Sequence, residues 1–233
     1  MGLHDVDDSP RDLSGGRRNI ASGDDDRSPG PQWLQWIKRL QAIAQDGLTY
    51  TKDDYDLGRY EQLRALAAEI LAAHSTGTLE EAGDLLALET GPATPKVDVR
   101  AAVFREGLIL LVNEPGDGGW SLPGGWADVG ESPSEAAARE TLEESGYRVR
   151  PVRLLAAYDR DRHDHPPTPY HVYKLVFLCE VLDEVPLTEV DTVGARFFGE
   201  QELPELSVSR VTEAQISRFF EQYRDPDCPT DFD

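Results

Sequence analysis

The sequence predicts an α/β protein in which a mixed β-sheet carries helices on both faces and follows a small all-α domain. Two observations support this class. Apolar residues recur at helical spacing from Gln32 to about Glu89. From Val97 onward, strand-like segments alternate with two helices, a pattern typical of a sheet covered on both faces. A linker with two prolines, residues 91–95, separates the two patterns.

Composition limits the functional classes. The chain has 233 residues, 39% of them hydrophobic and 29% charged, with a net charge of −21. A surface this acidic disfavours binding along a nucleic-acid backbone, which needs Lys and Arg to replace counterions, so we expect no nucleic-acid partner. The same charge would repel a polyphosphate substrate unless metal ions screened the site locally.

Cysteine usage and hydropathy give the expected compartment. The two cysteines, Cys179 and Cys228, do not have the spacing of metal ligands, so a reducing cytoplasm is the simplest location. No run approaches the roughly 18 apolar residues that span a bilayer, and we expect no membrane partner. Residues 1–30 are rich in Asp, Ser, Gly and Arg, and we expect a disordered acidic tail there.

Residues 31–91 are expected to form an N-terminal domain of three helices. Gly47 is expected to end the first helix, Asp53 or Asp54 can cap the second, and Thr78 with Glu81 forms a capping box for the third. Apolar positions recur every three to four residues in each of two segments. The first contains Trp33, Ile37 and Leu40, and the second contains Leu63, Ala67 and Ile70. Such a small bundle is marginal alone, so we expect it to pack on the rest of the protein or on a second subunit.

Residues 96–224 are expected to form the α/β domain, and 225–233 a C-terminal tail. The elements that the pattern predicts are strands at 97–104, 108–113, 120–122, 147–158, 170–182 and 195–198, with helices at 132–146 and 210–223.

The first of these helices carries the chemistry. Glu140, Glu143 and Glu144 stand at i, i+3 and i+4, so their carboxylates share one helix face and repel one another. Arg139 can neutralise only part of this charge, and Mg²⁺ or Mn²⁺ is the natural partner for hard oxygen ligands. The alternative is a solvated acidic face, which the preceding glycine pair and the adjacent arginine make the weaker interpretation.

The segment GGWADVGESPSEAAARETLEESGY, residues 124–147, resembles the signature of the Nudix hydrolases, which cleave nucleoside diphosphates linked to another moiety. The matching positions are Gly125, Glu131, Arg139, Glu140, Glu143, Glu144 and Gly146. Thr141 departs, since the family prefers an aliphatic residue there, which puts local packing in question rather than metal binding. The resemblance implies a Nudix α-β-α sandwich.

The resemblance extends over about residues 32–224. A helical domain joined to this core, with YDR-x-RH-x-HPP, YHVYKLVF and LS-x-SRVT segments, is similar to the Nudix branch that carries its own N-terminal domain. Bacterial CDP-choline pyrophosphatase and many proteins called ADP-ribose pyrophosphatases belong to that branch. This similarity implies a homodimer in which the N-terminal helices help form the interface.

For the metal site, we expect Glu140 and Glu144 as the main ligands of Mg²⁺ or Mn²⁺, Glu143 assisting, and a backbone carbonyl near Gly124 completing the set. Such metals would bridge two phosphates and activate the attacking water.

Arg139 is expected to orient the glutamates through an ion pair with Glu131. The general base stays open among Glu143, Glu144 and an acid outside the box such as Glu189.

Loop residues are expected to bind substrate. Arg160, Arg162, His163 and His165 lie between two strands and can contact a phosphate, and a solvated connection is the alternative. A structural zinc ion would need another ligand at familiar spacing, which the sequence does not offer. Trp126 and Tyr170 are candidates to stack on a base, or else core residues.

The sequence thus predicts a metal-dependent pyrophosphohydrolase that splits a nucleoside diphosphate linked to another moiety into two monophosphates, with CDP-choline or ADP-ribose as favoured substrates. Two alternatives stay open. One is a non-catalytic sensor of ADP-ribose or another nucleotide, although sensors can dispense with the acidic residues that are complete here. The other is a hydrolase of RNA 5′ ends, which the acidic charge disfavours.

Overall fold

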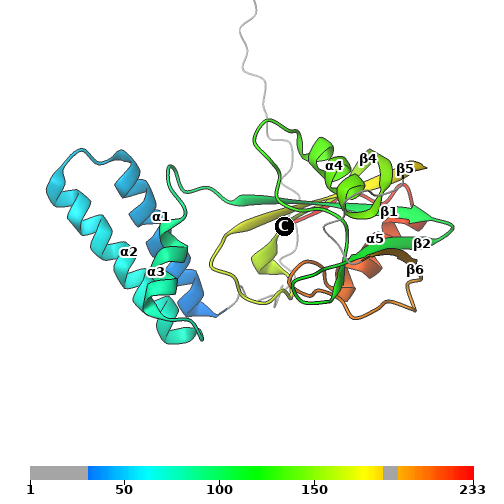
Figure 1. The fold of residues 1–233 in the computed structure, drawn as a ribbon. Coiled ribbons are helices and arrows are strands. Elements are labelled where there is room, and N and C mark those ends of the chain that lie inside the picture. The colour runs from blue at the N-terminus through cyan, green and yellow to red at the C-terminus, as the bar shows by residue number, and fades with distance from the viewer. Residues whose placement is uncertain (1–30, 186–193) are drawn as a thin grey trace, which may run out of the picture.

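The computed structural model describes residues 31–185 and 194–233. Three helices form a bundle beside an α/β domain, and a linker joins the two (Figure 1). The predicted disordered tail, residues 1–30, and the candidate base Glu189 lie outside the described residues. Within the described ranges, every helix falls short of the length or apolarity that a membrane span requires.

The helical bundle comprises α1 (Gln32–Tyr50), α2 (Asp54–His74) and α3 (Leu79–Ala87). Asp53 caps α2 by accepting hydrogen bonds from two backbone amides, and Thr78 and Glu81 form the predicted capping box of α3. One apolar stripe from each helix meets in the centre: Ile37, Ala67, Ala68, Leu71, Ala82 and Leu86. Trp36 on α1 stays 52% exposed.

Gly47 does not end α1, contrary to the prediction. The helix continues to Tyr50. A Cβ atom at Gly47 would lie 2.2 Å from Cδ1 of Tyr60, so the missing side chain makes room for a ring of α2 rather than stopping the helix.

The sheet has seven strands: β1 (Lys96–Arg105), β2 (Leu108–Asn113), β3 (Trp120–Ser121), β4 (Tyr147–Asp159), β5 (Val172–Glu184), β6 (Ala195–Phe198) and β7 (Asp231–Phe232). The order is β3-β2-β1-β5-β4-β7, and β6 pairs with β2. β1 runs parallel to β5, whereas β4 and β5 are antiparallel. The sheet is therefore mixed, as predicted.

Alternation along β1 sends its side chains to two cores. Val99, Ala101 and Val103 pack on the side of α4 (Pro133–Ser145). Ala102 and Phe104 pack on the side of α5 (Glu213–Arg224). Figure 1 shows the two helices on opposite faces of the sheet, which confirms the predicted layers.

The predicted C-terminal tail, residues 225–233, instead joins the sheet. β7 pairs parallel to β4 at Ala156 and Ala157. Arg218 of α5 holds Asp231 through two hydrogen bonds of 2.7 and 2.8 Å. Long-range charge-assisted contacts of this kind order a segment that lacks apolar periodicity.

Candidate active site

The Gly124–Gly125 turn lies against β1. Gly124 has φ +139°, and a Cβ atom there would stand 2.1 Å from the carbonyl oxygen of Val99. Val99 donates its N–H to the Gly125 carbonyl at 2.8 Å. Only glycine permits this approach, and the approach places the turn beside the helix that follows.

α4 begins and ends where its sequence signals predict. Ser132 and Glu135 form a capping box, and Gly146 ends the helix in the left-handed conformation with φ 74°. Thr141 is fully buried on the packing side, and its hydroxyl donates to the Ala137 carbonyl at 2.6 Å. The buried hydroxyl therefore has a hydrogen-bond partner, and Thr141 packs where the Nudix signature prefers an aliphatic residue.

Two carboxylates of α4 reach the glycine turn. Glu144 Oε2 accepts the N–H of Gly124 at 2.9 Å, and a Cβ on Gly125 would lie 3.1 Å from Oε2 of Glu140. Burial raises the pKa of Glu140, and burial raises the pKa of Glu144 to about 7. Glu143 points outward, with half of its side chain exposed.

Arg139 organises the remaining acids. Its Nε and Nη2 atoms donate to the two oxygens of Glu131 at 2.8 and 3.0 Å, which is the ion pair that the sequence predicts. Its Nη1 atom donates to Glu140 and Glu143, both at 2.9 Å. A planar guanidinium suits such multiple contacts and fixes the orientation of each carboxylate.

The donor set suits a hard divalent cation. Two carboxylates share a half-buried space beside glycines that keep it open, and their raised pKa values mark a charge that a cation would offset. Across the described ranges, no group of three or more His, Cys, Asp or Glu is arranged to hold a metal ion. For Glu143 to serve as a third metal ligand, its carboxylate would have to give up its hydrogen bond with Arg139. Gly124 contacts Glu144 through its amide, whereas the prediction gave it a role through its carbonyl.

A buried charge network next to this site was missed. Arg100 contacts Asp98 at 2.9 Å and lies 3.8 Å from Glu114, and Lys174 also pairs with Asp98. Burial would raise the pKa of Asp98, but Arg100 and Lys174 hold it below its ordinary value. Burial lowers the pKa of Lys174 to about 8. The available signal was a pair of charged residues alternating within the otherwise apolar β1.

The predicted phosphate contacts His163 and His165 are engaged elsewhere. His163 Nε2 lies 3.2 Å from Oδ2 of Asp233. His165 Nδ1 lies 2.7 Å from the Val208 carbonyl, and burial lowers the pKa of His165 to about 4. The neutral, half-buried imidazole of His165 cross-links two segments and does not supply positive charge for a phosphate.

The other predicted substrate residues divide into two groups. Arg160 is buried and donates to the Ser209 carbonyl at 3.2 Å. Arg162 and Tyr170 line a pocket between the helical bundle and the sheet. Trp126, directly after the glycine turn, is 52% exposed. The structure therefore leaves Arg162, Tyr170 and Trp126 accessible and places Arg160 inside the fold.

Comparison with known families identifies the fold. Residues 94–219 match the NUDIX domain family. The chain belongs to the Nudix hydrolases. Residues 31–86 match a second family, described as the UDP-X-like, N-terminal oligomerisation domain. The helical bundle and the sheet domain of this Nudix hydrolase thus correspond to two separate family descriptions.

Several relatives of this Nudix hydrolase have names. YjhB of Bacillus subtilis (strain 168), whose name places it provisionally among the ADP-ribose pyrophosphatases, is 48% identical over 202 residues, covering 87% of this chain and 97% of YjhB. An ADP-ribose pyrophosphatase structure from Streptococcus suis 89-1591 is 39% identical, with TM-score 0.54, covering 60% of this chain and all of that one. A UDP-X diphosphatase structure is 36% identical, with TM-score 0.56, covering 86% and 98%.

Proposed function

We propose that this Nudix hydrolase is a metal-dependent pyrophosphohydrolase that splits a nucleoside diphosphate linked to another moiety into two monophosphates. The observation that carries the proposal is the placement of Glu140 and Glu144 against the Gly124–Gly125 turn, where burial raises both pKa values. Mg²⁺ or Mn²⁺ held there would neutralise phosphate charge and lower the pKa of the attacking water.

The chain's own residues prepare this site. Glu140 and Glu144 would hold the cation, with Glu143 joining them on release from Arg139. Two hydrogen bonds to Glu131 anchor Arg139, and Arg139 in turn positions Glu140. Gly124 fixes Glu144 through its N–H. Restrained carboxylates lose little entropy when the ion and substrate bind, which favours catalysis.

Among substrates, ADP-ribose has the stronger support. YjhB and the Streptococcus suis protein carry the ADP-ribose pyrophosphatase name, and the third relative is a UDP-X diphosphatase. We rank CDP-choline behind these sugar-linked substrates. The match of residues 31–86 to an oligomerisation domain supports a homodimer formed through the helical bundle. We place the enzyme in the cytoplasm.

The test is an assay of the purified full chain against ADP-ribose, CDP-choline, UDP-glucose and nucleoside triphosphates, with products identified by mass. EDTA should abolish turnover, and Mg²⁺ or Mn²⁺ should restore it. Glu144→Gln should lower kcat by at least a hundredfold, whereas Glu69→Gln, on the exposed side of α2, should leave it unchanged. Activity of Glu144→Gln within a fewfold of wild type would refute the ligand assignment.

A further inference from the structure

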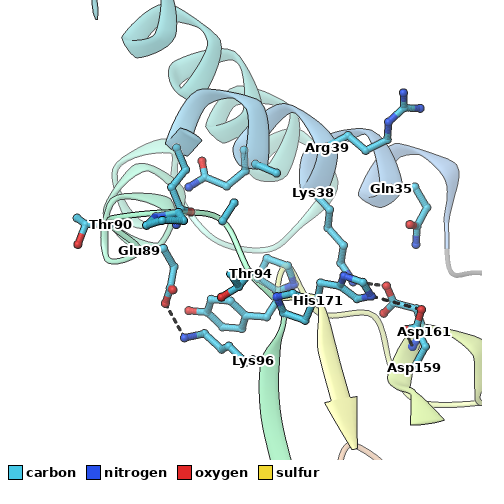
Figure 2. Close-up of a pocket in the computed structure, with 18 of the residues that line it drawn as sticks. Gln35, Lys38, Arg39, Glu89, Thr90, Thr94, Lys96, Asp159, Asp161 and His171 are labelled. Carbon is cyan, nitrogen blue, oxygen red and sulfur yellow. Dashed lines mark hydrogen bonds and ion pairs between the residues drawn. The ribbon is translucent and has the colours of Figure 1, made fainter. Parts of the chain in front are cut away.

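A large pocket lies between the helical bundle and the sheet domain. It has a volume of about 640 Å³ and is lined by α1, by the linker before β1 and by the segment that joins β4 to β5. Figure 2 shows Lys38, Asp159, Asp161 and His171 gathered at one end and the Glu89–Lys96 pair at the other. Volumes of about 300–1,000 Å³ are typical of small-molecule sites, which favour domain junctions.

The wall supplied by α1 is polar. Gln35, Lys38 and Gln45 lie at helical spacing on α1 and line the pocket. Lys38 pairs with Asp161 at 2.5 Å, and the two side chains are only 9% and 13% exposed. A helix that only docked on another domain would gain more from apolar residues, because a buried ion pair offers little net stability. This face is therefore suited to a polar ligand.

The opposite wall offers donors and acceptors in alternation. His171 lies 3.3 Å from Asp159, and Lys96 lies 2.7 Å from Glu89. Four basic side chains and three acidic ones line the pocket: Lys38, Arg39, Lys96, Arg162, Glu89, Asp159 and Asp161. This near balance contrasts with the net charge of −21 for the chain. The local balance therefore reduces repulsion of a nearby phosphate, and the polar lining can hydrogen-bond an uncharged group attached to it.

Lys96 and Trp126 link the pocket wall to the glycine turn of the candidate metal site. Gly125 lies beside Glu140, and Trp126 follows it. Lys96 Nζ, in the pocket wall, lies 5.9 Å from the centre of the Trp126 ring and 5.2 Å from that of Tyr170. A substrate whose diphosphate lies at the glutamates could thus extend past Trp126 into the pocket.

We propose that this interdomain pocket binds the sugar attached to the distal phosphate of the substrate, an inference that rests on the proposed pyrophosphohydrolase function. Sugar hydroxyls both donate and accept hydrogen bonds, which matches a wall of paired carboxylates and ammonium groups with Gln35 beside them. A quaternary ammonium such as choline is typically bound by aromatic faces, and the cationic Lys96 already lies over the Trp126 and Tyr170 rings. The helical bundle thereby helps to set substrate choice.

Kinetics with two substrates test the proposal. ADP-ribose carries the distal sugar, whereas the methyl ester of ADP carries the same diphosphate without it. Gln35→Ala and Asp161→Asn should each lower kcat/KM for ADP-ribose about tenfold, mainly through KM, and leave the methyl ester within twofold of wild type. Asp164→Asn is the matched control, because Asp164 is exposed in the same loop and does not line this pocket. Gln35→Ala leaves the Lys38–Asp161 pair intact, so it tests the contact without disturbing domain docking.

A binding measurement separates this proposal from the proposed function. Calorimetric titration of the metal-free protein with ribose 5-phosphate should detect binding that Gln35→Ala and Asp161→Asn weaken and Asp164→Asn does not. If wild type hydrolyses no substrate yet binds ribose 5-phosphate in this way, the proposed function fails and the sugar site stands. Unchanged ribose 5-phosphate affinity in both variants, equal losses for the two substrates, or a higher kcat/KM for CDP-choline than for ADP-ribose would overturn the sugar assignment.

Discussion

Replacing Glu144 with Gln should stabilise the metal-free protein at alkaline pH while it removes activity. Glu144 has an ordinary pKa of 4.5, and burial raises it to about 7 in the fold. A glutamine has nearly the same shape as a protonated glutamate, and its side-chain oxygen can still accept the N–H of Gly124. The substitution therefore removes the charge without removing the hydrogen bond.

The sign follows from the two pKa values. Below pH 4.5 the carboxyl of Glu144 is protonated in the folded and the unfolded chain, so burying it costs no ionisation energy and the folded state has its full stability. As pH rises through 4.5 towards 7, the unfolded chain ionises more readily, and this contribution is lost. A shift of this size corresponds to about 3 kcal/mol, and residual contact of the carboxyl with solvent reduces the expectation to about 2–3 kcal/mol.

Urea denaturation in EDTA at pH 4.5 and pH 8 measures this effect. The unfolding free energy of Glu144→Gln should match wild type at the lower pH and exceed it by about 2–3 kcal/mol at the higher pH. Saturating Mg²⁺ should stabilise wild type and not the variant, by about 3 kcal/mol at a hundred times Kd. Glu69→Gln should track wild type throughout. Wild type as stable as Glu144→Gln at pH 8 in EDTA would contradict the burial argument.

Four further substitutions test other parts of the structure. Gly125→Ala should lower kcat/KM at least tenfold in steady-state assays, with an unchanged circular dichroism spectrum, because its Cβ would crowd the carboxylate of Glu140. Arg153→Met should reduce the unfolding free energy in urea by about 2–3 kcal/mol, since Arg153 donates to the carbonyls of Gln222 in α5 and of Pro226 and Cys228 after it. Gly58→Ala should raise the melting temperature and increase the unfolding free energy by about 0.5–1 kcal/mol, because open space surrounds this helical glycine. Gly47→Ala should lower the melting temperature, because its Cβ would clash with the ring of Tyr60.

Local signals predicted the helices and most strands. The capping box of Ser132 and Glu135 and the stop at Gly146 depend on residues within a turn of one another, so they can be recognised without knowledge of the fold. The ion pair of Arg139 and Glu131 joins residues only eight positions apart, within the same short segment. The arrangement of the Nudix helix could therefore be anticipated from its own segment.

The features that sequence reasoning missed depend on distant partners. His165 lies near Val208 and Gln215, 43 and 50 residues away, so a loop that looked free to bind phosphate is packed internally. Asp98 and Lys174 meet because β1 and β5 run in parallel register, 76 residues apart. Neither contact has a periodicity or a spacing that a linear pattern could disclose.

The pocket beside α1 also has an evolutionary consequence. One wall belongs to residues 35–45 and the other to residues 159–171, while the Nudix signature lies between them in the chain. A recombination event that exchanged only the first domain would remodel one side of the cavity and spare the acidic helix. Lineages with the same hydrolytic segment could then diverge in preference by acquiring different helical modules.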